Sequence, residues 1–223
     1  LLVMIPSQNS DMTLKTKALY LPDGFVGDRG EQGTYGIAVD LGTTTLVVML
    51  WDLEEGRLVD VEAVSNPQRV YGTDVMTRLT FAMRKPWNLK RLQSSLINEI
   101  NQAVSRLTTK NQIRIGQVVK IAAVGNTIMS HFFLGEDISG LAGFPFEPAF
   151  QGSVLTVAKM LGLAAHEEAE VYLGPNMAGH VGSDVTAAVL ASGYMEQADE
   201  SGRFCFSVPV FLAVLWQVRD CLS

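Results

Sequence analysis

The sequence is poor in the residues that build metal clusters, disulfides and membrane spans. Its 223 residues include only two cysteines, Cys205 and Cys221. Neither belongs to a CxxC motif or to a cysteine–histidine cluster, so we predict no zinc or iron–sulfur centre within this chain. The apolar run 208–216 is about half as long as a bilayer span, and residues 1–5 are too few for a signal sequence. We therefore predict a cytoplasmic protein without a membrane partner.

Basic residues are scarce as well. Lysine and arginine number 17 against 23 aspartates and glutamates, which gives a net charge of -6. One short basic group is typical of a solvated helix entrance, and it consists of Arg84, Lys85, Lys90 and Arg91. These numbers argue against a surface that binds a phosphate backbone, so we predict no nucleic-acid partner. The chain is rich in apolar residues, at 48%, and this is enough for a packed core.

The chain divides into three parts by composition. Residues 1–34 mix polar stretches with prolines and glycines, which predicts a linker. Because the chain starts at Leu1 and not at a methionine, we expect a further segment before it. We assign 35–165 to a first lobe, or middle domain, and 166–223 to the truncated start of a C-terminal domain.

The hydrophobic periodicity predicts an α/β fold. Three early strands should form an antiparallel meander, with residues 54–56 as the turn between the second and third strands. Helices and strands should then alternate, which is the order of a ribonuclease-H-like lobe. We expect strands at 36–40, 44–53, 57–64, 118–124 and 171–173, helices at 73–83, 89–107, 127–134 and 183–191, and a packed irregular loop at 140–152.

The first candidate site is the turn after the first strand. Asp40 ends this strand and can offer Mg²⁺ a carboxylate oxygen through a water. Gly42 leaves room for backbone N–H groups to approach phosphate oxygens, and the hydroxyls of Thr43 and Thr44 can donate to the same oxygens. An ordinary hairpin turn would use the same residue types. The apolar runs on both sides of the motif favour the magnesium-nucleotide interpretation.

A second candidate site is the segment from Gly179 to Asp184, which opens the helix at 183–191. Gly179 and Gly182 are candidate nucleotide-binding glycines. Asp184 either caps the helix or faces a ligand, and the residues leave both alternatives open. Asp184 resembles, in its position, the aspartate that faces the transferred phosphoryl group in sugar kinases. This resemblance implies that it would orient or deprotonate a nucleophile, or bind magnesium through water.

Three histidines and one polar loop complete the candidates. Asn126 or Thr127 should cap the helix at 127–134, although their polar groups could line the site instead. We expect His131 to be a packed or surface side chain and not a ligand, and His166 to be solvated. His180, in the glycine-rich turn, is the best placed of the three for a role in the site.

Five sequence blocks, in this order, resemble the reductive activators of corrinoid proteins. They are Tyr-Gly-Ile-Ala-Val-Asp-Leu-Gly-Thr-Thr-Thr at 35–45, Asn-Pro-Gln-Arg at 66–69, Tyr-Gly-Thr-Asp-Val at 71–75, Val-Gly-Asn-Thr-Ile-Met at 124–129 and Ala-Gly-His-Val-Gly-Ser-Asp at 178–184. The resemblance implies an actin-like ATPase lobe of the ASKHA class, linked to a [2Fe-2S] ferredoxin domain. It also implies ATP and magnesium as ligands and a corrinoid protein of a methyltransferase system as partner. ATP would drive the reduction of cob(II)alamin to cob(I)alamin, with a homodimer as a candidate assembly.

The chain departs from this family pattern at both ends. The ferredoxin cysteines are absent, so we expect the [2Fe-2S] cluster in the full-length protein and not in this chain. A second D-x-G-T strand should follow the helix at 183–191, but residues 201–223 contain none. We therefore expect a truncated or frame-shifted end, without half of the nucleotide site. Two alternatives stay open: a small-molecule kinase in which Asp184 deprotonates a hydroxyl, and a non-catalytic actin-like module.

Overall fold

The computed structural model describes residues 34–177, 179 and 182–191. Several predictions concern residues outside this part of the chain: the linker (apart from Thr34), the tail after 191, both cysteines and His180.

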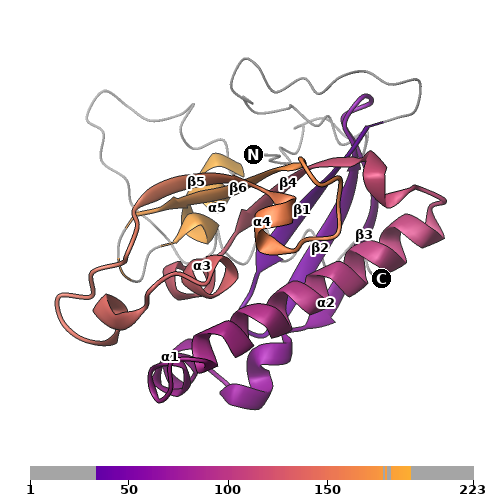
Figure 1. The fold of residues 1–223 in the computed structure, drawn as a ribbon. Coiled ribbons are helices and arrows are strands. Elements are labelled where there is room, and N and C mark those ends of the chain that lie inside the picture. Colours follow the sequence, from indigo (N-terminus) through magenta and orange to yellow (C-terminus); the bar gives the residue numbers. More distant parts are fainter. Residues whose placement is uncertain (1–33, 178, 180–181, 192–223) are drawn as a thin grey trace, which may run out of the picture.

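A six-stranded sheet organises the described residues (Figure 1). Its order is β3-β2-β1-β4-β6-β5, and β1, β4 and β6 run parallel to one another. The strands are β1 (Tyr35–Leu41), β2 (Thr45–Asp52), β3 (Arg57–Ser65), β4 (Val118–Val124), β5 (Gly152–Val157) and β6 (Glu170–Asn176). The antiparallel meander β1-β2-β3 confirms the prediction, whereas β5 was not predicted and β6 is longer than expected.

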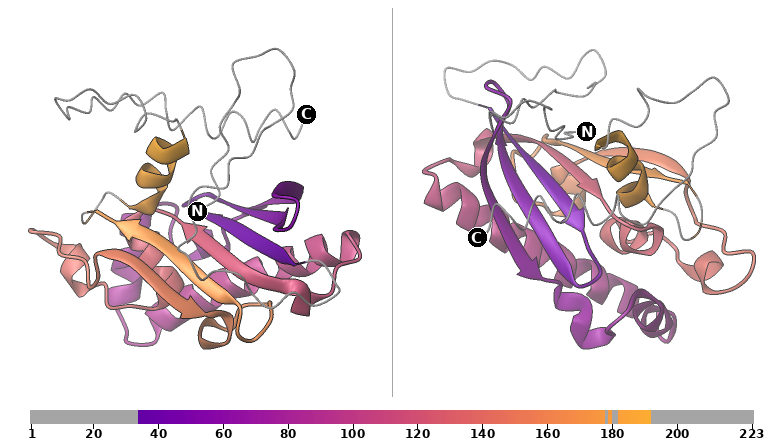
Figure 2. Two further views of the ribbon diagram at one scale, coloured as in Figure 1. Left: turned by 90° about the horizontal axis from the view of Figure 1, so that it is seen from above. Right: turned by 180° about the vertical axis from the view of Figure 1, so that it is seen from behind.

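Helices cover both faces of this sheet. They are α1 (Val75–Met83), α2 (Asn88–Lys110), α3 (Thr127–Leu134), α4 (Ala158–Leu161) and α5 (Ser183–Ala191), with 3-10 turns η1 (Pro67–Tyr71), η2 (Ile115–Gln117) and η3 (Ser139–Ala142). Figure 2 shows α2 and α3 on one face and α5 on the other. The coarse prediction of a mixed α/β fold is confirmed, with α1, α2, α3 and α5 at the predicted positions, whereas α4 was not predicted.

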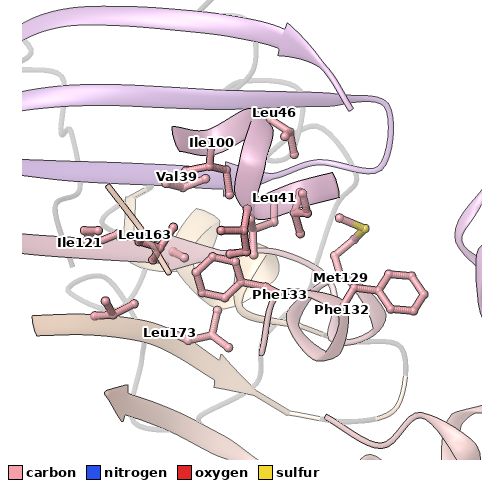
Figure 3. Close-up of a cluster of buried hydrophobic side chains, with 14 of the residues drawn as sticks. Val39, Leu41, Leu46, Ile100, Ile121, Met129, Phe132, Phe133, Leu163 and Leu173 are labelled. Atoms are coloured by element: carbon pink, nitrogen blue, oxygen red, sulfur yellow. The ribbon is translucent and has the colours of Figure 1, made fainter. Parts of the chain in front are cut away.

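The hydrophobic core lies between the sheet and the pair α2 and α3. Alternate residues of β1 point into it, because successive side chains of a strand face opposite sides. Figure 3 shows Val39 and Leu41 there, together with Phe133 of α3 and Leu173 of β6. Each of these buried side chains contributes roughly 1.5–3 kcal/mol. The core therefore holds β1, β4 and β6 in one rigid arrangement.

The other residues of β1 face the side on which α5 begins. Ala38 and Asp40 alternate with the core residues, so the carboxylate of Asp40 lies on this second face. On β6, an added Cβ at Gly174 would lie only 2.6 Å from the Cβ of Ser183. The start of α5 therefore packs closely against the second face, on the same side as Asp40.

The sheet continues across the predicted domain boundary. Strand β6 begins at Glu170 and pairs with β4 in parallel, with Ile121 opposite Val171. The division at residue 165 thus crosses a continuous sheet and stays a prediction. Among the described residues, none of the helices has both the length and the apolar character needed to span a bilayer.

Candidate phosphate-binding site

Three loops meet where the parallel strands β1, β4 and β6 end, and we call this place the carboxyl edge. Asp40 and Val124 are paired neighbours at the ends of β1 and β4. The first loop is the turn 41–45 after β1, the second is Gly125–Asn126 after β4, and the third leads from β6 to α5. The carboxyl edge is where open α/β sheets commonly bind ligands.

The turn 41–45 requires glycine at its second position. A Cβ added at Gly42 would lie 2.1 Å from the carbonyl oxygen of Thr45, which is far inside van der Waals contact. The carbonyl of Gly42 accepts a hydrogen bond from Nδ2 of Asn66 at 2.8 Å. The turn is therefore compact and fixed. Its residues Thr43 and Thr44 lie at the carboxyl edge, and Thr44 is exposed.

Asn126 links the first two loops. Its Oδ1 accepts from the backbone N–H of Met129 at 2.9 Å, which caps α3 and confirms the predicted cap. Its Nδ2 donates to the hydroxyl of Thr43 at 3.3 Å. Asn126 therefore caps the helix, as predicted, and also contacts the turn 41–45.

The start of α5 packs directly on the second loop. The hydroxyl of Ser183 accepts from the N–H of Gly125 at 3.0 Å and donates to its carbonyl at 3.2 Å. The N–H of Asp184 also donates to that carbonyl, at 3.3 Å. A Cβ at Gly182 would lie 2.3 Å from the same oxygen, so glycine is what allows this approach. The predicted glycine at 182 therefore positions α5 at the carboxyl edge.

Two carboxylates are close enough to interact at this edge. Burial and the nearby charge of Asp184 raise the pKa of Asp40 to about 6. Burial also raises the pKa of Asp184, partly offset by backbone N–H groups, including that of Val185. Asp184 lies in the first turn of α5 and does not precede it, so it is not the N-cap residue. Of the two alternatives for Asp184, its position beside Asp40 supports the ligand-facing one.

The remaining predicted residues lie elsewhere. A Cβ at Gly179 would meet the carbonyl of Phe146 at 2.2 Å, so this glycine packs against the loop at 140–152. His131 is buried and stacks on Phe150, which agrees with the packed alternative of that prediction. His166 is exposed, also as predicted.

Sequence reasoning did not identify three polar residues near the turn and the carboxyl edge. Asn66 and Arg78 are buried behind the turn 41–45, and both donate to its carbonyls. Both amide atoms of Asn176, at the end of β6, are buried without a hydrogen-bond partner among the described residues. Asn66 belongs to the Asn-Pro-Gln-Arg block, which was the available signal. Arg78 occupies an ordinary helical position, and nothing in its local sequence marks it.

No cluster of three or more His, Cys, Asp or Glu side chains able to hold a metal occurs in the described part of the chain. The pair Asp40 and Asp184 has a different character. Mg²⁺ commonly binds through one or two carboxylates while it keeps waters and contacts ligand phosphates. Two carboxylates beside a tight glycine turn suit that mode of binding.

Comparisons with known proteins agree with this arrangement. A family model described as "RACo middle region" matches residues 35–197. The chain is similar to the corrinoid activation enzyme RamQ of Eubacterium limosum, with 28% identity over 160 residues that cover 72% of this chain and 27% of RamQ. A solved structure of a reductive activator for corrinoid, iron-sulfur protein has a TM-score of 0.74 and 30% identity, over 77% of this chain and 27% of that chain.

The chain spans 27% of the length of each of these two relatives. The region matched by the family model includes the turn 41–45, the loop Gly125–Asn126 and the start of α5, so it contains all the loops of the carboxyl edge. This chain belongs to the RACo middle region family.

Proposed function

We propose that this chain forms one wall of the magnesium-nucleotide site of an ATP-dependent reductive activator of corrinoid proteins, with an actin-like ASKHA lobe. One observation carries the proposal: the D-x-G-T turn and the acid of a second glycine-flanked motif meet at the carboxyl edge. In the folded chain Asp40 and Asp184 interact, although 144 positions separate them in the sequence. Membership of the RACo middle region family supports a role in the activation of corrinoid proteins.

The residues at the edge suit this ligand. Asp40 would hold magnesium through water, and Asp184 would orient the attacking nucleophile or hold a water of the same ion. The N–H groups and hydroxyls of Thr43 and Thr44 would hold phosphate oxygens. Gly42 is required by the turn, and Gly182 by the contact with Gly125.

Within the full-length protein, nucleotide turnover at this site would drive an electron from a [2Fe-2S] domain outside this chain onto cob(II)alamin, producing cob(I)alamin. The partner is then a corrinoid protein of a methyltransferase system, and the compartment is the cytoplasm. Gly179, through its contact with the loop at 140–152, would support the site from a distance. A homodimer is the assembly we propose to examine first.

The test uses the complete gene product that contains these residues. ATP hydrolysis is measured with and without a corrinoid protein in its cob(II) state, and the cobalt oxidation state is followed by visible absorption with a competent electron donor. We expect stimulated hydrolysis and formation of cob(I). Absence of both would refute the proposal.

Asp40→Asn is the informative variant. It keeps the size of the side chain and removes the charge that would hold magnesium, so we expect loss of hydrolysis and of cobalt reduction. Glu54→Gln is the matched control, because this exposed acid lies in the β2–β3 turn, at the opposite end of β1 from the carboxyl edge. The control should retain the activity of the unmodified protein.

A small-molecule kinase is the second candidate, and the raised pKa of Asp184 favours it, since a raised pKa makes the carboxylate a stronger base towards a substrate hydroxyl. The two functions differ in the fate of the phosphate. A kinase transfers it to an organic hydroxyl, whereas the activator releases inorganic phosphate. Phosphate release matching ATP consumption would exclude the kinase.

A further inference from the structure

Three consecutive carbonyl oxygens of the turn 41–45 are held by Asn66 and Arg78. The carbonyl of Gly42 accepts from Nδ2 of Asn66 at 2.8 Å, and the carbonyl of Thr44 accepts from the backbone N–H of Asn66 at 2.8 Å. Between them, the carbonyl of Thr43 accepts from Nη2 of Arg78 at 2.6 Å. Three consecutive carbonyls are thus fixed by two residues of the segment that follows β3.

This arrangement determines where the N–H groups point. In a trans peptide the C=O and the N–H of one plane point in opposite directions. When the carbonyls of Gly42 and Thr43 point towards Asn66 and Arg78, the N–H groups of Thr43 and Thr44 point away from them. Neither N–H donates a hydrogen bond among the described residues. The turn therefore presents two unused donors on the side away from Arg78.

Arg78 is also an unusual residue for its position. Its side chain is 0% exposed, in the first half of α1. Its other side-chain hydrogen bonds go to the carbonyl of Gly72 at 2.9 Å, to Oε1 of Gln68 at 3.4 Å and to Sδ of Met129 at 3.7 Å, and all three acceptors are neutral. Its guanidinium has no carboxylate within ion-pair distance in the described part of the chain. Burying this charge is costly, and the nearby Asp74 compensates it only in part, so a further anion close to it would be favourable.

We propose that Arg78 is a positioning residue for the phosphate groups of a nucleotide at the turn 41–45. It holds the carbonyl of Thr43 so that the N–H groups of the turn face the ligand, and its positive charge acts on the phosphates through the buried interior. This inference rests on the proposed nucleotide site. Burial lowers the pKa of Arg78, and the nearby charge of Asp74 offsets this effect only in part.

The experiment compares Arg78→Met, Arg78→Lys and the control Arg91→Met in the complete gene product. Arg91 is an exposed arginine of α2, and the control removes the same charge from outside the site. Calorimetric titration gives the dissociation constants of Mg·ATP and of adenosine for each variant. Arg78→Met should weaken the binding of Mg·ATP by about tenfold or more and leave the binding of adenosine unchanged. Arg78→Lys, which keeps the charge without the fork of donors, should fall between the two.

The outcomes separate the two levels of the proposal. If the unmodified protein does not bind Mg·ATP, the proposed function itself is wrong. If it binds and Arg78→Met binds equally well, the role of Arg78 is wrong. An equal loss of Mg·ATP and adenosine affinity would show a purely structural arginine. Should Arg78→Met fail to fold, judged by circular dichroism, Arg78→Lys decides, and an unchanged affinity for Mg·ATP in that variant overturns the inference.

Discussion

Burial of the ionised carboxylate of Asp40 lowers the free energy of unfolding of the ligand-free chain, and binding of a cation at this site would raise it again. Burial and the neighbouring Asp184 both oppose its ionised form, which raises its pKa to about 6 from 3.8. Below pH 3.8 the carboxyl is protonated in both the folded and the unfolded chain, so it does not change the free energy of unfolding. As pH rises to 6 the unfolded chain ionises first, so folding loses stability. Above pH 6 the loss is complete, at about 3 kcal/mol. A cation bound at the carboxyl edge would reverse this loss of stability.

The first prediction is that Asp40→Asn stabilises the ligand-free chain. The amide removes the ionisation, so the free energy of unfolding should rise by about 2–3 kcal/mol at pH 8 and hardly change at pH 3.5. Urea unfolding in magnesium-free buffer at several pH values measures it. Glu54→Gln, which neutralises an exposed acid, should show no such pH dependence. Equal stability of Asp40→Asn and the unmodified chain at pH 8 would contradict the proposed electrostatics.

The second prediction concerns Gly42→Ala. The added Cβ would lie 2.1 Å from a backbone oxygen, so the turn has to shift. We expect a loss of about 1–3 kcal/mol in the free energy of unfolding and loss of Mg·ATP binding. Gly116→Ala serves as the control, because nothing lies within 4 Å of a Cβ at that position. Retained Mg·ATP binding in Gly42→Ala would show that the turn does not hold the phosphates.

At the scale of elements, His131 ties α3 to the loop at 140–152. Its Nδ1 lies 2.7 Å from the carbonyl of Thr127 and therefore donates, which leaves Nε2 to accept from the N–H of Ala149 at 3.1 Å. This pattern requires the neutral ring, and burial lowers the pKa of His131. The stability that these two hydrogen bonds contribute is therefore present at neutral pH. It falls as pH drops below the unfolded value of 6.5, because the unfolded chain then takes up a proton that the folded chain resists.

The third prediction is that His131→Phe weakens this connection. Phenylalanine keeps the stack on Phe150 but removes the acceptor for the N–H of Ala149 and the side-chain donor to the carbonyl of Thr127. A cost of about 1–3 kcal/mol follows, together with faster hydrogen exchange at Ala149 and a flatter pH dependence between pH 5 and 7. His166→Phe, at an exposed histidine, is the control. Unchanged exchange at Ala149 would mean that another group holds the loop.

The sequence allowed prediction of most elements but not of their meeting at one edge. Amphipathic spacing identified α2, a continuous apolar run identified β2, and the alternation of apolar residues identified β3. β5 was missed because Gly152–Val157 has no buried face of its own, and its pairing with β6 creates the strand. Asp40 and Asp184 were both predicted from local motifs. The buried Arg78 was not, since its role depends on the approach of Thr43, 35 positions away.

At the scale of the molecule, β6 joins the described residues on both sides of residue 165 into one continuous sheet. It pairs with β4 on one side and β5 on the other, and Val171 and Leu173 are fully buried in the core. A lobe that ended at residue 165 would lose these side chains and leave β5 without a partner. Ile121 and Phe133, which pack in the same cluster, would be exposed to water.

The fourth prediction is therefore that a version ending at residue 165 does not fold cooperatively, whereas one ending at residue 191 does. The lost burial of Val171 and Leu173 alone amounts to roughly 3–6 kcal/mol, which is comparable with the whole stability of a domain. Urea unfolding followed by circular dichroism tests this, with the fluorescence of the buried Trp51 in β2 as a second probe. We expect coincident transitions for the longer version and a broad, early one for the shorter version. If the shorter version unfolds at an unchanged midpoint, the division at residue 165 is a true domain boundary, and β6 is an addition to a lobe that is stable without it.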